Sequence, residues 1–390
     1  MSFEKYISQK AKEIPPSGIR KFFDLAQQME GVVSLGVGEP DFPTPWHVRE
    51  EAIHTINMGK TYYTASTGLP ELRKEICHYY QRRFSVGYSW QNECLVTTGA
   101  SEGIDLVMRA LLNPGDEVII LQPGYVAYEP CVLLAGGVVK VIELREENKF
   151  KLTKEQLEKA ITDKTKLLFL NFPSNPTGGV MTFQDYEPLV PIIKEKGILV
   201  LSDEIYAELS YVEEPCTLAQ FESIKDQVII LNGFSKAYSM TGWRLGYLLA
   251  NSIFIKAMND IHEYAVMCAS TISQYAGIEA LKNGDRDCEI HRSSFEQRRN
   301  FIVNGLKRLG FSCHLPDGAF YVFPSIQSTG LSSEEFCERL LKEEKVAVVP
   351  GTAFGQCGEG YIRISYAYSI DEIKEALHRI EKFLKKLKNS

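Results

Sequence analysis

The sequence lacks any pairing or clustering of the residues that usually form disulfides or bind metals. Its nine cysteines and seven histidines are scattered along 390 residues, with no Cys-x-x-Cys, no His-x-x-x-His and no mixed Cys/His group. Scattered cysteines without paired spacing are typical of reduced thiols in a cytoplasmic protein. A zinc site has no support either, because such sites need closely spaced ligands. We therefore expect a cytoplasmic protein that holds no metal.

Long apolar runs, an excess of positive charge and internal repeats are also missing. No run approaches the roughly 20 apolar residues that span a bilayer, and the opening Met-Ser-Phe-Glu-Lys lacks the apolar stretch of a signal peptide. The net charge is −7, so no basic surface favours nucleic acid. The lysines near the C-terminus close an amphipathic helix, where cations suit the helix dipole. We expect neither a membrane nor a nucleic-acid partner.

What is present is the composition of a soluble globular protein that is too long for one ordinary core. Hydrophobic residues make up 44% of the chain and charged residues 24%. At 390 residues, two domains are the natural expectation. We predict a large domain over residues 46–284. Residues 1–45, with an N-terminal arm, and residues 285–390 are predicted to form a small domain.

Short apolar runs bounded by turn signals predict strands, and apolar residues at helical spacing predict helices. The predicted strands are residues 32–35, 93–97, 117–121, 166–169, 198–201, 228–231, 245–249, 319–323, 346–349 and 361–366. The predicted helices are residues 19–29, 46–57, from 70, after 103, 153–161, 253–267, 270–281, 285–309, 332–342 and from 369 to the end. Alternating strands and helices form right-handed βαβ crossovers. The fold class is therefore α/β, with a mainly parallel central sheet in the large domain and a smaller α+β domain.

Residues that can carry chemistry gather directly after predicted strands of the large domain. They are Asn175, Asp203, Tyr206, Lys236, Tyr125 and the turn at residues 98–103. Ligands of parallel α/β sheets bind outside the carboxyl ends of the strands, so we expect these residues to converge. A strand, a small-residue turn and a helix N-terminus also form the geometry that holds a phosphate. Alone, that turn is equally compatible with a tight connection.

The loop between the apolar runs 228–231 and 245–249 holds the residue on which the interpretation depends. It contains Lys236 and Arg244 together with two serines and two glycines. A lysine removed from solvent can form a Schiff base with pyridoxal phosphate (PLP). An arginine and a serine hydroxyl beside glycines suit a phosphate. Taken alone, the loop fits better a surface loop with solvated basic residues, and the rest of the chain is what changes this interpretation.

A bound PLP needs further partners, and the convergent residues can supply them. Asp203 is a candidate to face the protonated pyridine nitrogen, although a helix N-cap is the alternative for this aspartate alone. Asn175 and Tyr206 can hydrogen-bond the ring oxygen, and the amine of Lys236 can move a proton at the substrate Cα. Arg363 alternates with apolar neighbours and can bind an α-carboxylate. Its alternative is an exposed arginine on an edge strand.

Seven pieces of the chain together match a known family pattern. They are residues 34–42, 63–73, 98–102, 175–178, 202–206, 235–244 and 361–365. In this order, over almost the whole chain, they resemble the PLP-dependent class I aminotransferases of fold type I. The resemblance is to the bacterial and archaeal branch of broad amino-acid aminotransferases. Each piece is modestly specific, and seven in register are very specific.

The resemblance implies a role at the PLP ring for several of these residues. Lys236 is similar to the lysine that forms the internal aldimine, and Asp203 to the partner of the pyridine nitrogen. Asn175 and Tyr206 resemble the ligands of the ring oxygen. Tyr125 resembles the residue that stacks on the ring, where relatives often have tryptophan.

The resemblance also implies where the phosphate and the substrate bind. The implied phosphate ligands are the backbone of Ala100, Ser101 and Glu102 with the side chains of Ser235 and Arg244. The implied α-carboxylate site is Arg363, helped by the Gly38 backbone and Asn175. Tyr63 is implied to reach the phosphate of the neighbouring subunit, so a homodimer with shared active sites is expected.

The implied activity is transfer of an α-amino group from an L-amino acid to a 2-oxo acid by a ping-pong mechanism, in amino-acid biosynthesis. A PLP-dependent carbon–sulfur β-lyase of similar fold is the alternative, which releases pyruvate and ammonia without an oxo-acid acceptor. A regulator that keeps the fold as an effector-binding module is a third hypothesis. Such regulators usually carry an appended DNA-binding domain, and the residues before Gly38 leave no room for one.

Three features depart from the family pattern or narrow it. Gly233 stands where some members carry a phosphate-binding serine, so the phosphate site is expected to have one contact fewer. No second arginine for a distal carboxylate can be assigned, which leaves aspartate preference open. Residues 17–23 resemble the branch that handles aromatic, alanine and diaminopimelate-type substrates.

Overall fold

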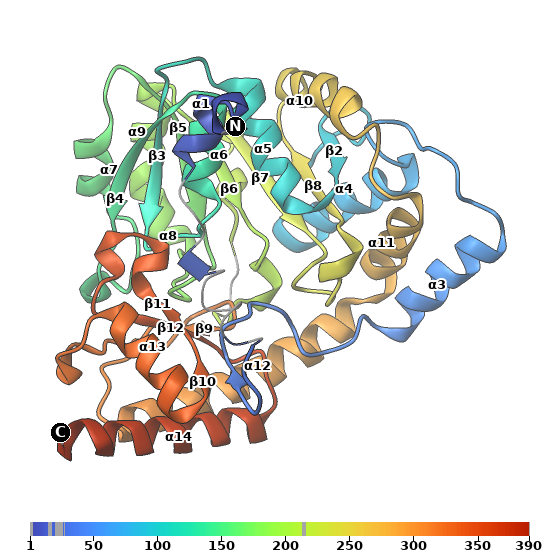
Figure 1. The fold of residues 1–390 in the computed structure, drawn as a ribbon. Coiled ribbons are helices and arrows are strands. Elements are labelled where there is room, and N and C mark those ends of the chain that lie inside the picture. The colour runs from blue at the N-terminus through green and yellow to red at the C-terminus, as the bar shows by residue number, and fades with distance from the viewer. Residues whose placement is uncertain (1–2, 15–17, 20–25, 27, 213–215, 390) are drawn as a thin grey trace.

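The computed structural model describes residues 3–14, 18–19, 26, 28–212 and 216–389 (Figure 1). The helix predicted at residues 19–29 and the stretch 17–23 lie largely outside the described residues. A single 3-10 turn at Phe3–Tyr6 precedes the short helix α1 (Gln9–Glu13), whose N-terminus is capped by the Ser8 hydroxyl. The Lys10 amine then donates a hydrogen bond to the carbonyl oxygen of Leu134 at 2.8 Å, which ties this first segment to the body of the protein.

A seven-stranded sheet forms the centre of the molecule. In spatial order its strands are β2 (Cys94–Thr97), β8 (Gly246–Leu249), β7 (Val228–Gly233), β6 (Leu199–Asp203), β5 (Thr165–Asn171), β3 (Glu117–Gln122) and β4 (Val138–Glu143). Only β8 runs antiparallel to its neighbours in this sheet, and the remaining pairs are parallel. The predicted mainly parallel sheet is therefore confirmed. The edge strand β4 was not predicted.

Helices cover both faces of this sheet, which is why its strands are apolar on both sides. One face packs against α5 (Gly99–Leu111), α6 (Tyr128–Ala135) and α10 (Ser252–Ala265). The other face packs against α3 (Trp46–Asn57), α4 (Pro70–Phe84), α7 (Lys154–Ala160), α8 (Phe183–Tyr186), α9 (Val190–Lys196) and α11 (Thr271–Asn283). Strand β5 illustrates the alternation, since Leu167 and Phe169 join the first core and Leu168 and Leu170 the second.

Most helices begin where the sequence predicts. Pro70 occupies the first turn of α4, where its missing N–H costs nothing. The Thr153 hydroxyl and the Gln156 side chain form the predicted capping box of α7. Helix α5 starts at Gly99, earlier than predicted, so the small-residue turn is itself the first turn of the helix. Among the described residues, no helix combines the length and apolarity needed to cross a membrane.

The remaining elements pack around a core of their own. They are β1 (Val33–Ser34), α12 (Asp285–Arg308), β9 (Tyr321–Val322), α13 (Ser333–Glu344), β10 (Val346–Ala347), β12 (Ile362–Ser365) and α14 (Ile370–Asn389). The neighbouring β11 (Val349–Pro350) differs, because its Val349 joins the core on the α4 side of the large sheet. Strand β12 is central in the antiparallel order β11-β12-β9. The strand predicted at residues 346–349 is two strands with different partners, because β10 pairs with β1 and β11 pairs with β12. The domain boundaries at residues 46 and 284 remain a proposal.

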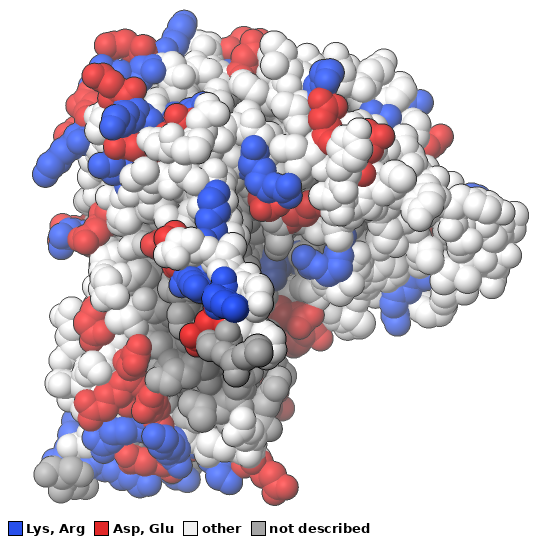
Figure 2. All heavy atoms as spheres, turned by 45° about the horizontal axis from the view of Figure 1, so that its top comes forward, with Lys and Arg blue, Asp and Glu red and all other residues white. Residues whose placement is uncertain are grey.

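Charges of both signs intermingle on the face drawn in Figure 2. Several ion pairs of the described residues form within one helix, such as Arg379 with Glu375 at 2.7 Å. Exposed pairs of this kind contribute little to stability. The surface charge therefore gives no local concentration that marks a partner on this face.

Candidate functional site

A cavity of about 410 Å³ lies where the carboxyl ends of the central strands meet β9 and β12. Asp203 ends β6, and Lys236 follows β7. The register of the parallel strands aligns Asn171 of β5 with Asp203, and Asp203 with Leu231 of β7. Eleven of the predicted site residues line this cavity: Gly38, Ala100, Ser101, Tyr125, Asn175, Asp203, Tyr206, Ser235, Lys236, Arg244 and Arg363.

Lys236 is partly buried in the cavity and is not a solvated surface lysine. Its Nζ donates a hydrogen bond to the carbonyl oxygen of Gly38 at 2.7 Å and lies 5.9 Å from the centre of the Phe320 ring. Desolvation lowers the pKa of the Lys236 amine from 10.5 to about 8, opposed by the nearby carboxylate of Glu39. The neutral, nucleophilic amine is therefore accessible near physiological pH.

Asp203 presents a buried carboxylate to the same cavity. Its Oδ2 accepts a hydrogen bond from the Tyr128 hydroxyl at 2.8 Å, and its Oδ1 accepts one from the backbone N–H of Ile205 at 3.1 Å. Burial raises the pKa of Asp203 to about 6, although these hydrogen bonds oppose the shift. The carboxylate is thus mainly ionised at pH 7. Sequence reasoning placed Tyr128 on a loop and missed this contact, for which the sequence contains no signal.

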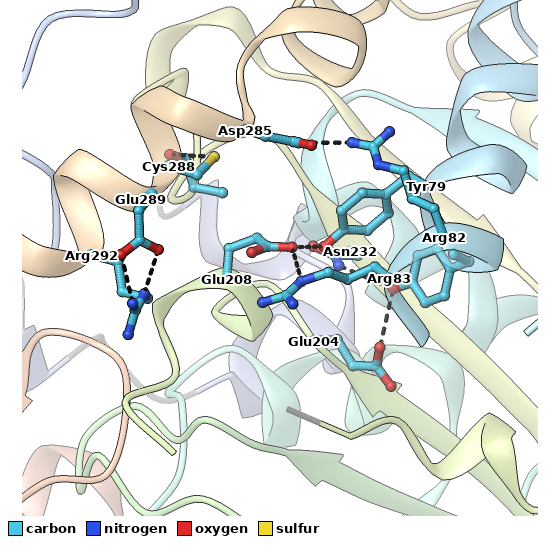
Figure 3. A network of polar contacts seen from close by, with 12 residues as sticks. Tyr79, Arg82, Arg83, Glu204, Glu208, Asn232, Asp285, Cys288, Glu289 and Arg292 are labelled. Atoms are coloured by element: carbon cyan, nitrogen blue, oxygen red, sulfur yellow. Dashed lines mark hydrogen bonds and ion pairs between the residues drawn. The ribbon is translucent and has the colours of Figure 1, made fainter. Parts of the chain in front are cut away.

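The adjacent Glu204 does not line the cavity and belongs instead to a network of polar contacts (Figure 3). It accepts hydrogen bonds from Tyr80 at 3.0 Å and from Thr217 at 2.6 Å. Asn232 of β7 donates in turn to the Tyr80 hydroxyl at 3.0 Å. Burial raises the pKa of Glu204 to about 7. This carboxyl joins α4 to the ends of β6 and β7, and Asp203 is the acid of the pair that lines the cavity.

Arg363 projects from the central strand β12 and is only 3% exposed, so it is not an exposed edge-strand arginine. Its Nη1 donates to Asn175 Oδ1 at 2.9 Å, and its Nη2 donates to the carbonyl oxygen of Gly36. Its Nε is buried without a hydrogen-bond partner among the described residues. Both acceptors are uncharged, and burial lowers the pKa of the guanidinium. A buried cation held in this way is prepared to bind an anion.

Two tyrosines complete the wall beside Arg363. The hydroxyl groups of Tyr206 and Tyr321 lie 2.9 Å apart, and the Arg363 guanidinium stacks 4.6 Å from the centre of the Tyr321 ring. Burial holds the pKa of the Tyr206 phenol well above its usual value, so it remains a hydrogen-bond donor. A Cβ at Gly38 would lie 2.0 Å from the Tyr321 hydroxyl oxygen. Glycine is therefore required there, and Tyr321 was missed by the sequence analysis.

The N-terminus of α5 forms the end of the cavity that suits a phosphate. Ala100 and Ser101 belong to its first turn, whose backbone N–H groups have no partner within the helix. Arg244 lies close by, because a Cβ at Gly99 would come within 2.7 Å of its Nη2 atom. The Ser235 hydroxyl lines the same part of the cavity, so it joins these backbone N–H groups and the Arg244 guanidinium at the positive end of the α5 dipole.

This donor set fits PLP. The α5 N-terminus at Ala100 and Ser101, with Ser235 and Arg244, forms a phosphate cup that matches the phosphate of the cofactor. The Asp203 carboxylate matches the pyridine nitrogen, the Tyr206 phenol matches the ring oxygen, and the Lys236 amine with its lowered pKa matches the aldehyde. The unpartnered Arg363 Nε leaves a further donor for an amino-acid carboxylate. The described residues contain no group of three or more His, Cys, Asp or Glu placed to hold a metal ion.

Two of the predicted residues do not line the cavity. The Glu102 side chain turns away from it and pairs with His262 Nδ1 at 2.7 Å. Tyr63 is 82% exposed and contributes nothing to the cavity of its own chain. The prediction that Tyr63 acts on the neighbouring subunit stays a prediction.

Comparisons with known proteins agree on one family. The model of the family described as Aminotransferase class I and II matches residues 30–380. The Bacillus subtilis (strain 168) protein YugH, whose name includes aminotransferase and no substrate, is 51% identical over 98% of this chain and 99% of its own. An aspartate aminotransferase of Pyrococcus abyssi (strain GE5 / Orsay) is 41% identical, with 98% and 99% covered.

A solved structure has the same fold over nearly the whole chain. The crystal structure of an aromatic aminotransferase from Pyrococcus horikoshii OT3 superposes with a TM-score of 0.90 at 39% identity, covering 94% of this chain and 99% of the other. All three of these relatives are named as aminotransferases, and they give no support to the lyase alternative.

Proposed function

The chain belongs to the class I and II aminotransferase family, and on that basis we propose that the cavity at the ends of β5, β6 and β7 is its PLP site, with Lys236 as the lysine that binds the cofactor. The protein is a PLP-dependent aminotransferase that moves an amino group from an amino acid to a 2-oxo acid. One observation carries the site assignment: Lys236, Asp203 and Arg363 line a single cavity.

Each end of the cofactor has a proposed partner in this cavity. The α5 N-terminus at Ala100 and Ser101, with Ser235 and Arg244, would hold the phosphate. The remaining ring contacts are assigned to Asp203 at the nitrogen, to Asn175 and Tyr206 at the oxygen, and to Tyr125 at the ring face. Support comes from the ionised state of Asp203 and the protonated state of Tyr206.

The residues around the substrate have separate tasks. Bound PLP supplies an electron sink that stabilises negative charge on the substrate Cα. In the first half-reaction Lys236 is proposed to remove the proton from Cα of the amino acid, because a neutral amine acts as a general base. In the second half-reaction the same amine would deliver a proton to Cα of the 2-oxo acid. Arg363 with Asn175 would bind the α-carboxylate and fix the orientation of the substrate. The proposed order is ping-pong because the amino acid and the 2-oxo acid would use the same α-carboxylate site in turn, so the first product must leave before the second substrate binds.

We place this enzyme in the cytoplasm and in amino-acid biosynthesis, as the sequence predicts. All nine cysteines are free thiols, and reduced cysteines are typical of cytoplasmic proteins. Relatives named for aspartate and for aromatic amino acids are similarly close, so neither name is transferred to this chain. Among the described residues that line the cavity, Arg244 and Arg363 are the arginines.

Borohydride trapping of the cofactor tests the assignment of Lys236. Reduction of the enzyme with bound PLP should leave a pyridoxyl group on the peptide that contains Lys236. Because only the neutral amine attacks the aldehyde, cofactor uptake by PLP-free protein should rise with pH through about 8, not through 10.5. At pH 7 roughly one amine in ten would be neutral, against about one in three thousand for an ordinary lysine.

A Glu39→Gln variant provides the matched control for this pH dependence. Glu39 is the charged neighbour that most strongly raises the pKa of Lys236. Its neutralisation should therefore move the midpoint of uptake below that of the unaltered enzyme. Label on a different lysine would refute the site, and a midpoint near 10.5 would refute the role of burial.

We further propose a homodimer in which Tyr63 completes the partner's phosphate site. The support is an exposed apolar surface on α3 and the segment after it, which project from the sheet in Figure 1. Its members are Trp46, Ile53, Ile56, Met58, Tyr62 and Tyr63. Large apolar side chains exposed along one segment of a chain favour an association site there. A symmetric dimer is the commonest closed assembly that buries such a surface.

Hybrid dimers test whether active sites are shared. A Lys236→Ala variant and a Tyr63→Ala variant should each have low activity alone. Refolded together in equal amounts, they should recover about a quarter of normal activity, because half of the dimers carry one intact site of two. No recovery in dimers shown to be mixed would mean that Tyr63 serves its own subunit or neither.

A further inference from the structure

His262 of α10 lies against the N-terminus of α5, outside the cavity. Its side chain is 0% exposed, and its Nδ1 is 2.7 Å from Glu102 Oε1. The second ring nitrogen, Nε2, is buried without a hydrogen-bond partner among the described residues. Among the described residues, this imidazole therefore makes one hydrogen bond, to Glu102. The mechanism above does not use this contact.

Glu102 in turn holds the start of α5. Its Oε2 accepts a hydrogen bond from the backbone N–H of Thr98 at 2.5 Å. Thr98 is the N-cap residue, yet its own hydroxyl makes no capping bond and is buried without a partner. The Glu102 carboxylate therefore fills the half of a capping box in which an acidic side chain accepts from the N-cap amide, whereas the half that the threonine hydroxyl would fill is not formed. It fixes the turn that precedes Ala100 and Ser101.

A carboxylate at this position is also a competitor for a bound phosphate. Both anions favour the positive end of the α5 dipole and its N–H groups. Glu102 belongs to the first turn of α5 but turns away from the cavity. The imidazole that binds Oε1 holds it in that orientation. Without that donor, the carboxylate would be free to swing toward the amides of the cup and to repel a dianion there.

We propose that His262 is a positioning residue for the phosphate cup, which acts by holding the Glu102 carboxylate on the Thr98 amide and away from the phosphate. This inference rests on the proposed PLP site. The proposal specifies which part of the ligand the His262–Glu102 contact affects: it supports binding of a phosphate monoester at the α5 N-terminus. It does not support binding of the pyridine ring, whose partners Asp203 and Tyr206 lie elsewhere in the cavity.

The test compares PLP with pyridoxal, which has the same ring and aldehyde but no phosphate. In the full-length protein, a His262→Leu variant should raise the Kd for PLP about 10-fold or more, since a charge-assisted hydrogen bond is lost. Its Kd for pyridoxal should change less than about two-fold. Equal weakening of both ligands would indicate a general packing role and would overturn the proposal. Unchanged binding of PLP would also overturn it.

Conservative variants keep the test decisive even if the leucine variant does not fold. Asparagine can place its amide N–H where Nδ1 stands, whereas glutamine places its amide nearer the position of Nε2. His262→Asn should bind PLP nearly as well as the unaltered enzyme, and His262→Gln should bind it weakly. The reverse order, or equal affinities, would contradict a role carried by Nδ1.

A double variant tests whether Glu102 transmits the effect. Glu102→Gln removes the competing charge but keeps an oxygen for Thr98. The loss caused by His262→Leu should therefore shrink in the Glu102→Gln background, which a double-mutant cycle measures. Additive losses would sink the proposed coupling.

His47→Leu is the matched control for His262→Leu, because the Nδ1 of His47 pairs with Glu279 at 2.8 Å away from the cavity. It should leave PLP affinity unchanged, and a loss there would remove the specificity claimed for His262. Borohydride labelling of Lys236 in the unaltered enzyme separates the two levels of inference. Absence of that label would refute the PLP site itself, whereas label with normal PLP binding in His262→Leu would refute only the role of His262.

Discussion

Replacing Lys236 by methionine is expected to lower kcat by about 10⁴-fold, because it removes the proposed covalent anchor of the cofactor and the proposed base at the substrate Cα. Methionine keeps an unbranched side chain of similar length, so the cavity wall is retained. The rate that remains in this variant measures how much catalysis comes from the other residues that orient the cofactor and the substrate. Single-turnover absorbance of the bound cofactor, followed with a saturating amino acid, is the direct measurement.

The same substitution is expected to stabilise the cofactor-free protein. Burial lowers the pKa of Lys236 from 10.5 to about 8. At pH 7 the amine is protonated in both states, so the folded state carries an energetic cost of about 3 kcal/mol. The methionine variant avoids this cost but also loses the hydrogen bond to Gly38, which offsets about 1 kcal/mol. The variant should therefore be more stable by roughly 2 kcal/mol at pH 7. The charge cost disappears as pH rises from about 8 to about 10.5, where the unfolded lysine also loses its proton, so above this range the variant should be about 1 kcal/mol less stable than the unaltered protein.

Lys166→Met is the matched control for both effects. Lys166 forms an ion pair with Asp116 at 2.7 Å and does not line the cavity. Its replacement should leave kcat unchanged and should not stabilise the protein. Urea unfolding of the cofactor-free variants gives the free energies. Full activity in Lys236→Met, or a lower stability of that variant at pH 7, would contradict the assigned state of the amine.

The position of the site was predictable because it follows from topology. In a mainly parallel sheet the chain leaves every parallel strand at the same edge, so polar residues after apolar runs must converge. Asp203 and Lys236 meet this condition, and the structure places both in one cavity. Arg363 was harder to place, because its burial depends on β12 lying between β11 and β9. Alternation alone did not decide between a central and an edge strand.

Partners that come from distant segments were not predictable from one sequence. Tyr128 reaches Asp203 across 75 positions, and Tyr206 meets Tyr321 across 115. Nothing in the local pattern of either tyrosine records such a contact. The pair Asp203 and Glu204 is intermediate, because alternation along a strand sends two adjacent acids to opposite faces. Pattern alone leaves open which of them faces the ligand.

The strands that were missed or merged have weak or ambiguous patterns. Strand β4 lies at the sheet edge with most of its residues partly or fully exposed, so it lacks the continuous apolar run of a buried strand. The run at residues 346–349 is apolar throughout, and its division between β10 and β11 is set by which neighbour each half pairs with. Tertiary pairing, not composition, decides such cases.

Replacing Arg363 by leucine is expected to lower kcat/KM for amino acids by about 10²- to 10³-fold, mainly through KM. The guanidinium is buried among uncharged acceptors, with Nε unpartnered among the described residues, so a substrate carboxylate would be its compensating anion. Loss of one partner of a buried charge pair costs about 2–5 kcal/mol. Since its proposed partner is the substrate, retention of PLP should change little.

A simple amine without a carboxylate gives the decisive comparison. If Arg363 binds the α-carboxylate, the leucine variant should use such an amine about as well as the unaltered enzyme does, and the preference for amino acids should collapse. Arg299→Leu is the matched control, because Arg299 is also buried and stacks 4.5 Å from the centre of the Tyr211 ring, but does not line the cavity. It should keep the preference. Loss of PLP from Arg363→Leu, or an equal fall with both substrates, would assign this arginine to the cofactor or to the fold, because a carboxylate contact has no means to affect a substrate that lacks one.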